Sequence, residues 1–337
     1  MSQRESALNE WLKQLPMLSD FTLTALAGDA SFRRYYRLTD HQHTYIVMDA
    51  PPEKEGLVSF MLIGDVLRKH NIHAPEIIAK NTIEGFLLLE DLGDTLLTTH
   101  LTMDNASLRY TACLDTLIQI QQCPTRQPLL PKFDTAHMLQ EMMLFKTWFL
   151  EKLLNVSLDA HEEKQLQTFF MELALHLSDQ PQCFIHRDYH SRNLLILHPS
   201  DRKDNTLTIG VIDFQDAMKG PFTYDLVSLI KDCYIHWKDE HQQNWMKYFY
   251  EHLPNTFNWS FDEFQQGVDW CGLQRHLKVL GIFSRLYLRD NKLNYLSDLP
   301  LVLSYTKQCA MQYPAFHTLY EIIEKKITPA FQERQSA

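Results

Sequence analysis

Apolar and polar positions change their spacing along this chain. Near the start, apolar residues recur at helical spacing and predict a helix over residues 4–15. Residues 21–52 instead hold short β-branched and aromatic runs, divided by a glycine turn and a polar turn, which predicts three antiparallel strands. A helical pattern over 56–70 precedes two apolar runs, 74–80 and 85–94, that predict two further strands. The first part of the chain therefore favours a small sheet with one helix.

After about residue 92 the pattern becomes mainly helical. Asp134 is a candidate N-cap for a segment in which Met and Phe side chains recur every three or four residues. One strand pair, 193–198 and 207–214, interrupts the helices. We therefore predict an α+β fold, with a small antiparallel-sheet lobe over 1–91 and a larger helical lobe with an embedded hairpin over 92–337.

The composition of the chain argues against several classes of binding partner. The net charge of -10 and the scattered Lys and Arg residues argue against a nucleic-acid partner, because phosphate backbones are bound by clustered basic residues. The polar start of the chain and the lack of long apolar runs predict no membrane association and a cytoplasmic location, and we expect no obligate protein partner. The six cysteines are widely spaced and are expected to be reduced.

The candidate catalytic and metal-binding residues are concentrated in two runs, HRDYHSRNLL at 186–195 and VIDF at 211–214. Asp188 and Asn193 stand in a predicted loop before one strand, and Asp213 follows the next strand, so a hairpin would bring the three together. Kinases use this spacing: the first Asp accepts the proton of the attacking hydroxyl, while the Asn and the second Asp hold magnesium. The motif predicts Asp188 as catalytic base, Asn193 and Asp213 as Mg²⁺ ligands, and ATP as the phosphate donor.

The D-x-H-x-x-N run formed by Asp188, His190 and Asn193 resembles the aminoglycoside-phosphotransferase and choline-kinase branch of the protein-kinase-like enzymes. Longer runs, among them GDASFRRYYRL, YIVMDAPP and IGVIDFQDAMKGPFTYDLVSL, are similar to the bacterial anomeric amino-sugar kinases of cell-wall recycling. That resemblance covers about residues 20 to 300. It implies a bilobal kinase-like fold and phosphorylation of the C1 hydroxyl of N-acetylmuramate or N-acetylglucosamine, so the expected partner is a small amino sugar.

The resemblance also implies nucleotide-binding positions. Gly28, Asp29, Ala30 and Ser31 would form the turn over the ATP phosphates, whose backbone amides can hold an anion. The end of the last strand in the first lobe, from Glu90 to Leu92, would bind adenine through backbone hydrogen bonds. A simple turn between the lobes would have a similar sequence.

Several polar residues near the motif are candidates for the sugar site. Arg187 and Arg192 would meet a substrate carboxylate or pair with nearby acids. His190 marks the small-molecule branch, and Asp216 would touch the sugar, bind a second Mg²⁺ or cap a turn. Asp225 stands where a helix N-cap belongs, and the resemblance makes it a brace of the catalytic loop.

One departure from the kinase pattern stands out. Met48 occupies the position of the strand lysine that pairs with the ATP phosphates. We expect another cation to replace it and favour Arg34, with Arg33, Arg37 and Lys54 also within sequence reach. Glu53 or Glu55 would stand for the kinase helix glutamate, whose usual partner is the lysine that Met48 replaces.

Two other functions fit the sequence. The first is phosphotransfer to another small hydroxyl compound, such as an aminoglycoside, choline or homoserine. The second is a nucleotide-binding pseudokinase, which Met48 favours and the intact set of Asp188, Asn193 and Asp213 disfavours.

Overall fold

The computed structural model describes residues 3–26, 32–41, 43–126, 130–197, 207–254 and 258–336. The predicted phosphate turn at 28–31 lies outside these residues. The chain folds into two compact units, each made of two segments. Unit 1 comprises residues 1–100 and 192–216, and unit 2 comprises 101–191 and 217–337. The functional division predicted at residues 91 and 92 stays a prediction.

The core of unit 1 is a five-stranded antiparallel sheet in the order β1-β2-β3-β5-β4. Its strands are β1 (Phe21–Ala25), β2 (Arg34–Asp40), β3 (His43–Asp49), β4 (Ile77–Asn81) and β5 (Phe86–Glu90). All five strands were expected from the sequence.

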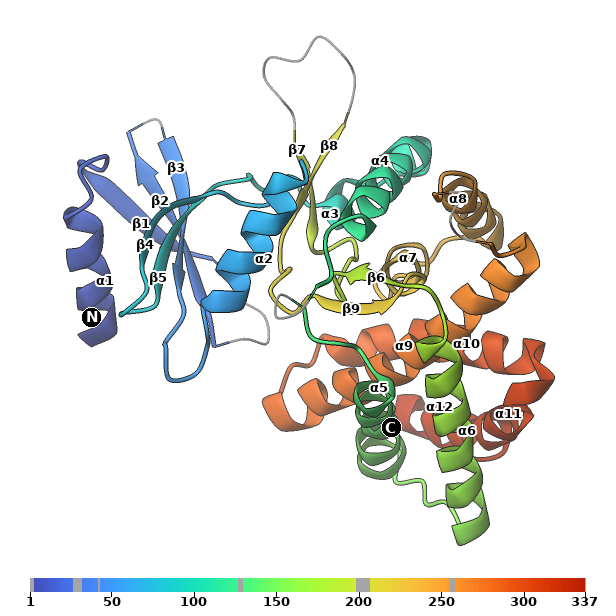
Figure 1. Cartoon of the computed structure of the whole chain (residues 1–337). Coiled ribbons are helices and arrows are strands. Elements are labelled where there is room, and N and C mark those ends of the chain that lie inside the picture. The colour runs from blue at the N-terminus through green and yellow to red at the C-terminus, as the bar shows by residue number, and fades with distance from the viewer. Residues whose placement is uncertain are drawn as a thin grey trace. The chain divides into compact units, whose positions relative to one another are not determined.

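Two helices flank this sheet, one on each side (Figure 1). On one face, α1 (Gln3–Lys13) buries Leu8, Trp11 and Leu12 against strand residues that include Val47. On the other side lies α2 (Val58–Lys69), and α3 (Leu97–His100) follows the sheet in the chain. The helices expected over 4–15 and 56–70 are therefore present.

The predicted hairpin also belongs to unit 1. It consists of β7 (Leu194–Leu197) and β8 (Thr208–Val211), paired so that Leu194 lies opposite Val211. Phe214, just beyond β8, packs against Phe60 of α2 with ring centroids 4.9 Å apart. Gly64 allows this approach, because a Cβ there would lie 3.2 Å from the Phe214 ring.

Unit 2 is mainly helical, as predicted. Its helices are α4 (Met103–Gln121), α5 (Thr135–Leu144), the π-helix η1 (Phe145–Leu153), α6 (Ala160–Ser178), α7 (Tyr224–Ile230), α8 (Asp239–Glu251), α9 (Phe261–Asp290), α10 (Tyr295–Gln312), the short η2 (Pro314–Phe316), α11 (His317–Ile322), the π-helix η3 (Ile323–Ile327) and α12 (Thr328–Ser336). Asp134 caps α5 as expected, accepting a hydrogen bond from the backbone of His137.

The helices α5 and α9 approach each other closely. Gly281 of α9 makes this possible, because a Cβ there would lie 2.3 Å from the carbonyl carbon of Leu144. The approach sets polar residues of the two helices against each other.

The expectation of a single strand pair among the helices was wrong. A second antiparallel pair joins β6 (Gln182–Ile185) to β9 (Met218–Pro221) in unit 2. Each strand has only four residues, and β9 contains Gly220 and Pro221, so neither has the alternation that marks a strand in sequence. Strand β6 leads directly into the loop that carries Asp188.

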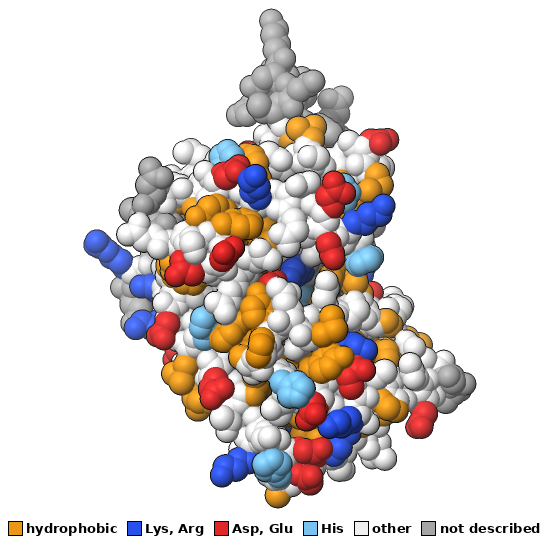
Figure 2. All heavy atoms as spheres, turned by 90° about the vertical axis from the view of Figure 1, so that its right-hand side faces the viewer, with side chains coloured by type: hydrophobic (Ala, Val, Ile, Leu, Met, Phe, Trp, Pro, Cys, Tyr) orange, Lys and Arg blue, Asp and Glu red, His pale blue; other side chains and the backbone are white. Residues whose placement is uncertain are grey.

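The six cysteines are all buried and free. None of the helices in the described residues combines the length and hydrophobicity that a bilayer crossing requires. Figure 2 shows one face of the molecule, on which Lys and Arg side chains lie among Asp and Glu side chains. That face therefore offers no basic patch of the kind that binds a nucleic-acid backbone.

Candidate active site

The β7–β8 hairpin brings two of the predicted residues together in unit 1. Asn193 immediately precedes β7 and Asp213 follows β8, and the backbone N–H of Ile212 donates to the carbonyl of Asn193 at 3.1 Å. The Asn193 Nδ2 donates to Asp213 Oδ2 at 3.3 Å. The convergence of these two side chains follows the sequence prediction.

The chemistry of this pair fits a magnesium ion. Asp213 is exposed, and its backbone has a φ of 64°, a left-handed conformation that is unusual for a residue other than glycine. Mg²⁺ uses one or two protein oxygens and completes its octahedron with phosphate and water oxygens, so a carboxylate and an amide suffice. Rotation of the Asn193 amide would turn its oxygen toward the same ion. The described residues contain no group of three or more His, Cys, Asp or Glu side chains suited to a metal.

In unit 2, the loop that carries Asp188 is held by a buried carboxylate. The backbone N–H groups of His186 and Arg187 donate to the two oxygens of Asp225 at 2.6 and 2.9 Å. Arg187 has a φ of 77°, so the chain turns sharply there. Asp225 lies in the first turn of α7, whose N-cap is Thr223. The predicted N-cap role was therefore wrong, and the predicted brace role is confirmed.

Asp225 gives a stability prediction. Burial raises the pKa of Asp225 to about 6, although the neighbouring His186 and the two N–H groups oppose this rise. A raised pKa means that the contribution of this carboxyl to stability is complete below about pH 4 and is lost as the pH rises through about 6. We expect Asp225→Asn to be less stable than the native protein, with a deficit that shrinks by about 3 kcal/mol between pH 4 and pH 7. Urea unfolding across this pH range measures the deficit, and a constant deficit would contradict the prediction.

The carboxylate of Asp188 lies in a strongly positive environment. Burial alone would raise its pKa, but the charges of Lys278, His190, Arg275 and Arg187 outweigh burial and lower the pKa to about 2. Its side chain is partly exposed. Asp188 is therefore ionised at every physiological pH, as a proton acceptor must be.

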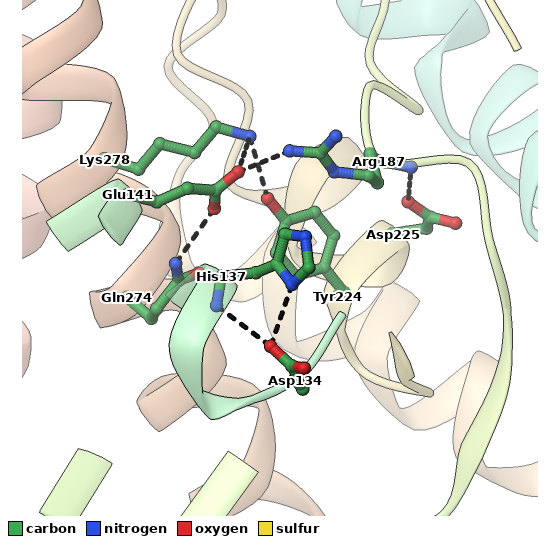
Figure 3. Close-up of polar contacts among 8 residues, drawn as sticks. All are labelled: Asp134, His137, Glu141, Arg187, Tyr224, Asp225, Gln274 and Lys278. Atoms are coloured by element: carbon green, nitrogen blue, oxygen red, sulfur yellow. Dashed lines mark hydrogen bonds and ion pairs between the residues drawn. The ribbon is translucent and has the colours of Figure 1, made fainter. Parts of the chain in front are cut away.

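A buried ionic cluster that the sequence analysis missed supplies part of this positive charge (Figure 3). Glu141 of α5 forms ion pairs with Arg187 and with Lys278 of α9, the second at 3.2 Å. The Lys278 Nζ also donates to the hydroxyl of Tyr224 at 3.2 Å, and the Gln274 Nε2 donates to Glu141 at 3.1 Å. Burial opposes the charge on Glu141, but Lys278 and Arg187 lower its pKa.

A signal for this cluster was present in the sequence. Glu141 interrupts the apolar stripe of α5 between Met138 and Phe145, and Lys278 stands within an apolar run of α9. A buried charge requires an opposite charge, so each of these positions indicated a partner without identifying it.

The other predicted sugar-site residues lie in different surroundings. The guanidinium of Arg187 belongs to the Glu141 ion pair. The ring of His190 packs edge-on against Tyr234, with centroids 5.2 Å apart. Arg192 and Asp216 are exposed, and Asp216 accepts a hydrogen bond from Gln215 at 3.2 Å.

At the predicted adenine-binding strand, the backbone N–H of Glu90 donates to the carbonyl of Glu76 at 2.8 Å. The side chain of Glu90 lies 3.0 Å from the ring of His73. The side chain of Leu92 packs over Gly210 of β8, where a Cβ would lie 3.0 Å from it. The nucleotide role of Glu90 and Leu92 stays a prediction.

Comparison with known proteins agrees with the fold and with the motif. Residues 22–259 match the model of the family described as "Phosphotransferase enzyme family". The chain belongs to this family. The predicted catalytic motif at 186–214 lies within the matched region.

Curated relatives match this member of the family over most of its length. A protein of Neisseria meningitidis serogroup B, named N-acetylmuramate/N-acetylglucosamine kinase, is 35% identical over 95% of this chain and 95% of its own. A protein of the same name from Pseudomonas aeruginosa is 35% identical over 89% of this chain and 87% of its own. The resemblance stated from sequence motifs is therefore confirmed.

Solved structures confirm the fold. The GDP complex of aminoglycoside 2'-phosphotransferase-IIIa superposes with a TM-score of 0.63 at 15% identity, covering 91% of this chain and 99% of that chain. A choline kinase of Streptococcus pneumoniae gives the same TM-score at 12% identity, with 91% and 100% covered. The predicted α+β, protein-kinase-like fold is correct.

Proposed function

We propose that this protein transfers a phosphoryl group from ATP to the anomeric C1 hydroxyl of N-acetylmuramate, N-acetylglucosamine or both. The observation that carries the proposal is the 35% identity, over 95% of both chains, to a relative named for these two sugars. The presence of Asp188, Asn193 and Asp213 supports it, because all three roles of the kinase motif are filled.

In the proposed reaction, Asp188 orients the C1 hydroxyl and accepts its proton. The sugar oxygen forms a bond to the γ-phosphorus, the bond from that phosphorus to the β,γ-bridging oxygen breaks, and ADP leaves. The low pKa of Asp188 keeps it ionised, so it is ready to accept the proton without a prior deprotonation step.

Asn193 and Asp213 are the proposed ligands of Mg²⁺, which neutralises phosphate charge when bound. The Asp213 carboxylate is held in place by Gln215, whose Nε2 donates to its Oδ1 at 3.0 Å. Gly28, Asp29, Ala30 and Ser31 are the proposed phosphate turn, and Glu90 to Leu92 the proposed adenine strand. Arg187, His190, Arg192 and Asp216 are the candidates for contacts with the sugar.

The proposed cellular role follows from the product. A sugar 1-phosphate is activated at C1, so an enzyme that couples it to a nucleotide would consume it. We place this chemistry in recycling of cell-wall amino sugars in the cytoplasm, without an obligate protein partner.

Product analysis tests this proposal. We expect ³¹P NMR of a reaction with N-acetylmuramate, ATP and Mg²⁺ to show ADP and a phosphate coupled to the C1 proton. The same measurement with glucose, choline, homoserine and an aminoglycoside provides the comparison. Faster turnover of one of these compounds would assign a different substrate, and the absence of magnesium-dependent ATP binding in calorimetry would favour the pseudokinase.

A further inference from the structure

The two faces of the unit 1 sheet hold different arginines. Side chains alternate between faces along a strand, so Arg34, Tyr36 and Leu38 of β2 share the face covered by α1. Arg34 donates there to Asp49 at 2.7 Å, and Arg4 of α1 contacts the same carboxylate. The guanidinium of Arg34 therefore joins β2 to β3 through Asp49, the carboxylate that also binds Arg4 of α1.

The opposite face carries the position of the missing lysine. Met48 is fully buried there, and Tyr35 is its cross-strand partner. A buried thioether cannot bind phosphate oxygens, so a cation for the nucleotide has to come from another residue.

Arg33 lies next to this position, directly before β2. It forms an ion pair with Glu55 at 2.9 Å, and both side chains are largely buried, at 9% and 19% exposure. The backbone N–H of Phe32 also donates to Glu55, at 3.4 Å. Glu55 precedes α2 by three residues, so the pair connects the start of β2 to the start of the helix.

The charges of this ion pair and of Asp213, a proposed Mg²⁺ ligand, act on the same hydroxyl group, that of Tyr35. Burial raises the pKa of Tyr35 to about 12, and the charges of Arg33, Asp213 and Glu55 also act on it. The ion pair and Asp213 therefore lie close enough to the same hydroxyl to influence it. A magnesium ion on Asp213 would carry the nucleotide phosphates into this region.

A guanidinium is suited to binding a carboxylate and a nucleotide phosphate at the same time. It carries five N–H donors in a rigid fork, so it can hold a carboxylate along one edge and a phosphate oxygen along another. Kinases achieve the same with a strand lysine and a helix glutamate. In this chain Glu55, three residues before α2, pairs with Arg33, which directly precedes β2.

We propose that Arg33, positioned by Glu55, is the cation that binds the phosphates of the nucleoside triphosphate in place of the lysine that Met48 replaces. This inference rests on the proposed ATP-dependent function. It leaves Arg34, the arginine favoured from sequence, in its ion pair with Asp49 on the other face of the sheet.

Binding of ATP and of adenosine to variants of the full chain tests the proposal, with Mg²⁺ present and calorimetry as the readout. We expect Arg33→Ala to weaken ATP binding about 10- to 100-fold while adenosine binding stays unchanged, because only the phosphate contact is lost. Arg33→Lys should recover part of the ATP affinity. Glu55→Gln should weaken ATP binding by a smaller factor, because it removes the partner that orients the guanidinium.

Lys69→Ala is the matched control, since it removes an exposed cation of α2 that pairs with Asp65. It should bind ATP as the native protein does. ATP affinity unchanged in Arg33→Ala, or a larger loss in Arg34→Ala than in Arg33→Ala, would overturn the proposal. Native protein that binds no ATP would instead refute the proposed function itself, so the two failures are distinguishable.

Discussion

Asp188→Asn should lower kcat by about 10²- to 10⁴-fold, the usual contribution of a positioned general base. The amide cannot accept the hydroxyl proton, whereas the contacts that bind ATP are predicted to come from other residues. ATP affinity should therefore stay near that of the native protein. Steady-state kinetics with ATP and N-acetylmuramate, together with calorimetry of ATP binding, measure both quantities.

A stability measurement accompanies this variant. The lowered pKa of Asp188 means that its ionised form stabilises the fold above about pH 4, and that this contribution is lost as the pH falls toward 2. Asp188→Asn should therefore lower the free energy of unfolding at pH 7 by about 2 kcal/mol. Turnover equal to that of the native protein, in a variant shown to be folded, would remove Asp188 from the mechanism.

Lys278→Met is expected to have the second largest effect. Lys278 is nearly buried, and its loss leaves Glu141 with one fewer cation, at a cost of about 3 to 5 kcal/mol in unfolding free energy. Lys278 also contributes more than any other charge to the lowered pKa of Asp188. Without Lys278, the pKa of Asp188 should rise by about 1 to 3 units. The acid limb of the kcat/KM profile should then shift to higher pH by a similar amount.

The pH profile separates this effect from simple destabilisation. Lys146→Met provides the control, because Lys146 is another partly buried lysine of unit 2, paired with Glu151 and Glu163. It should lose stability without a change in the acid limb. An acid limb in Lys278→Met that coincides with the native one would show that Lys278 serves the fold alone.

The sequence predicted those parts of the fold that depend on local pattern. The helix at α1 followed from apolar spacing, and the hairpin that joins Asn193 to Asp213 followed from two apolar runs with a polar turn between them. In both cases the residues that decide the structure lie within a short stretch of chain, so their pattern is visible without knowledge of the tertiary fold.

The parts that were missed depend on contacts between distant segments. Strands β6 and β9 pair Gln182 with Pro221, and neither strand has a hydrophobic alternation of its own. The two cationic partners of Glu141, Arg187 and Lys278 of α9, are far along the chain, and nothing near Glu141 specifies them. Likewise, the sequence analysis favoured Arg34 over its neighbour Arg33, and only their partners in the structure, Asp49 and Glu55, distinguish the two.

The backbone at Arg187 and Asp213 has an evolutionary consequence. Both residues adopt a left-handed conformation that costs an ordinary side chain about 1 kcal/mol or more, and glycine would adopt it freely. Random mutagenesis screened for heat resistance alone should therefore enrich glycine or asparagine at position 213, whereas Arg187 should be retained because it pairs with the largely buried Glu141. Screening for growth that depends on the enzyme should restore aspartate at position 213, so heat resistance and activity select different residues there.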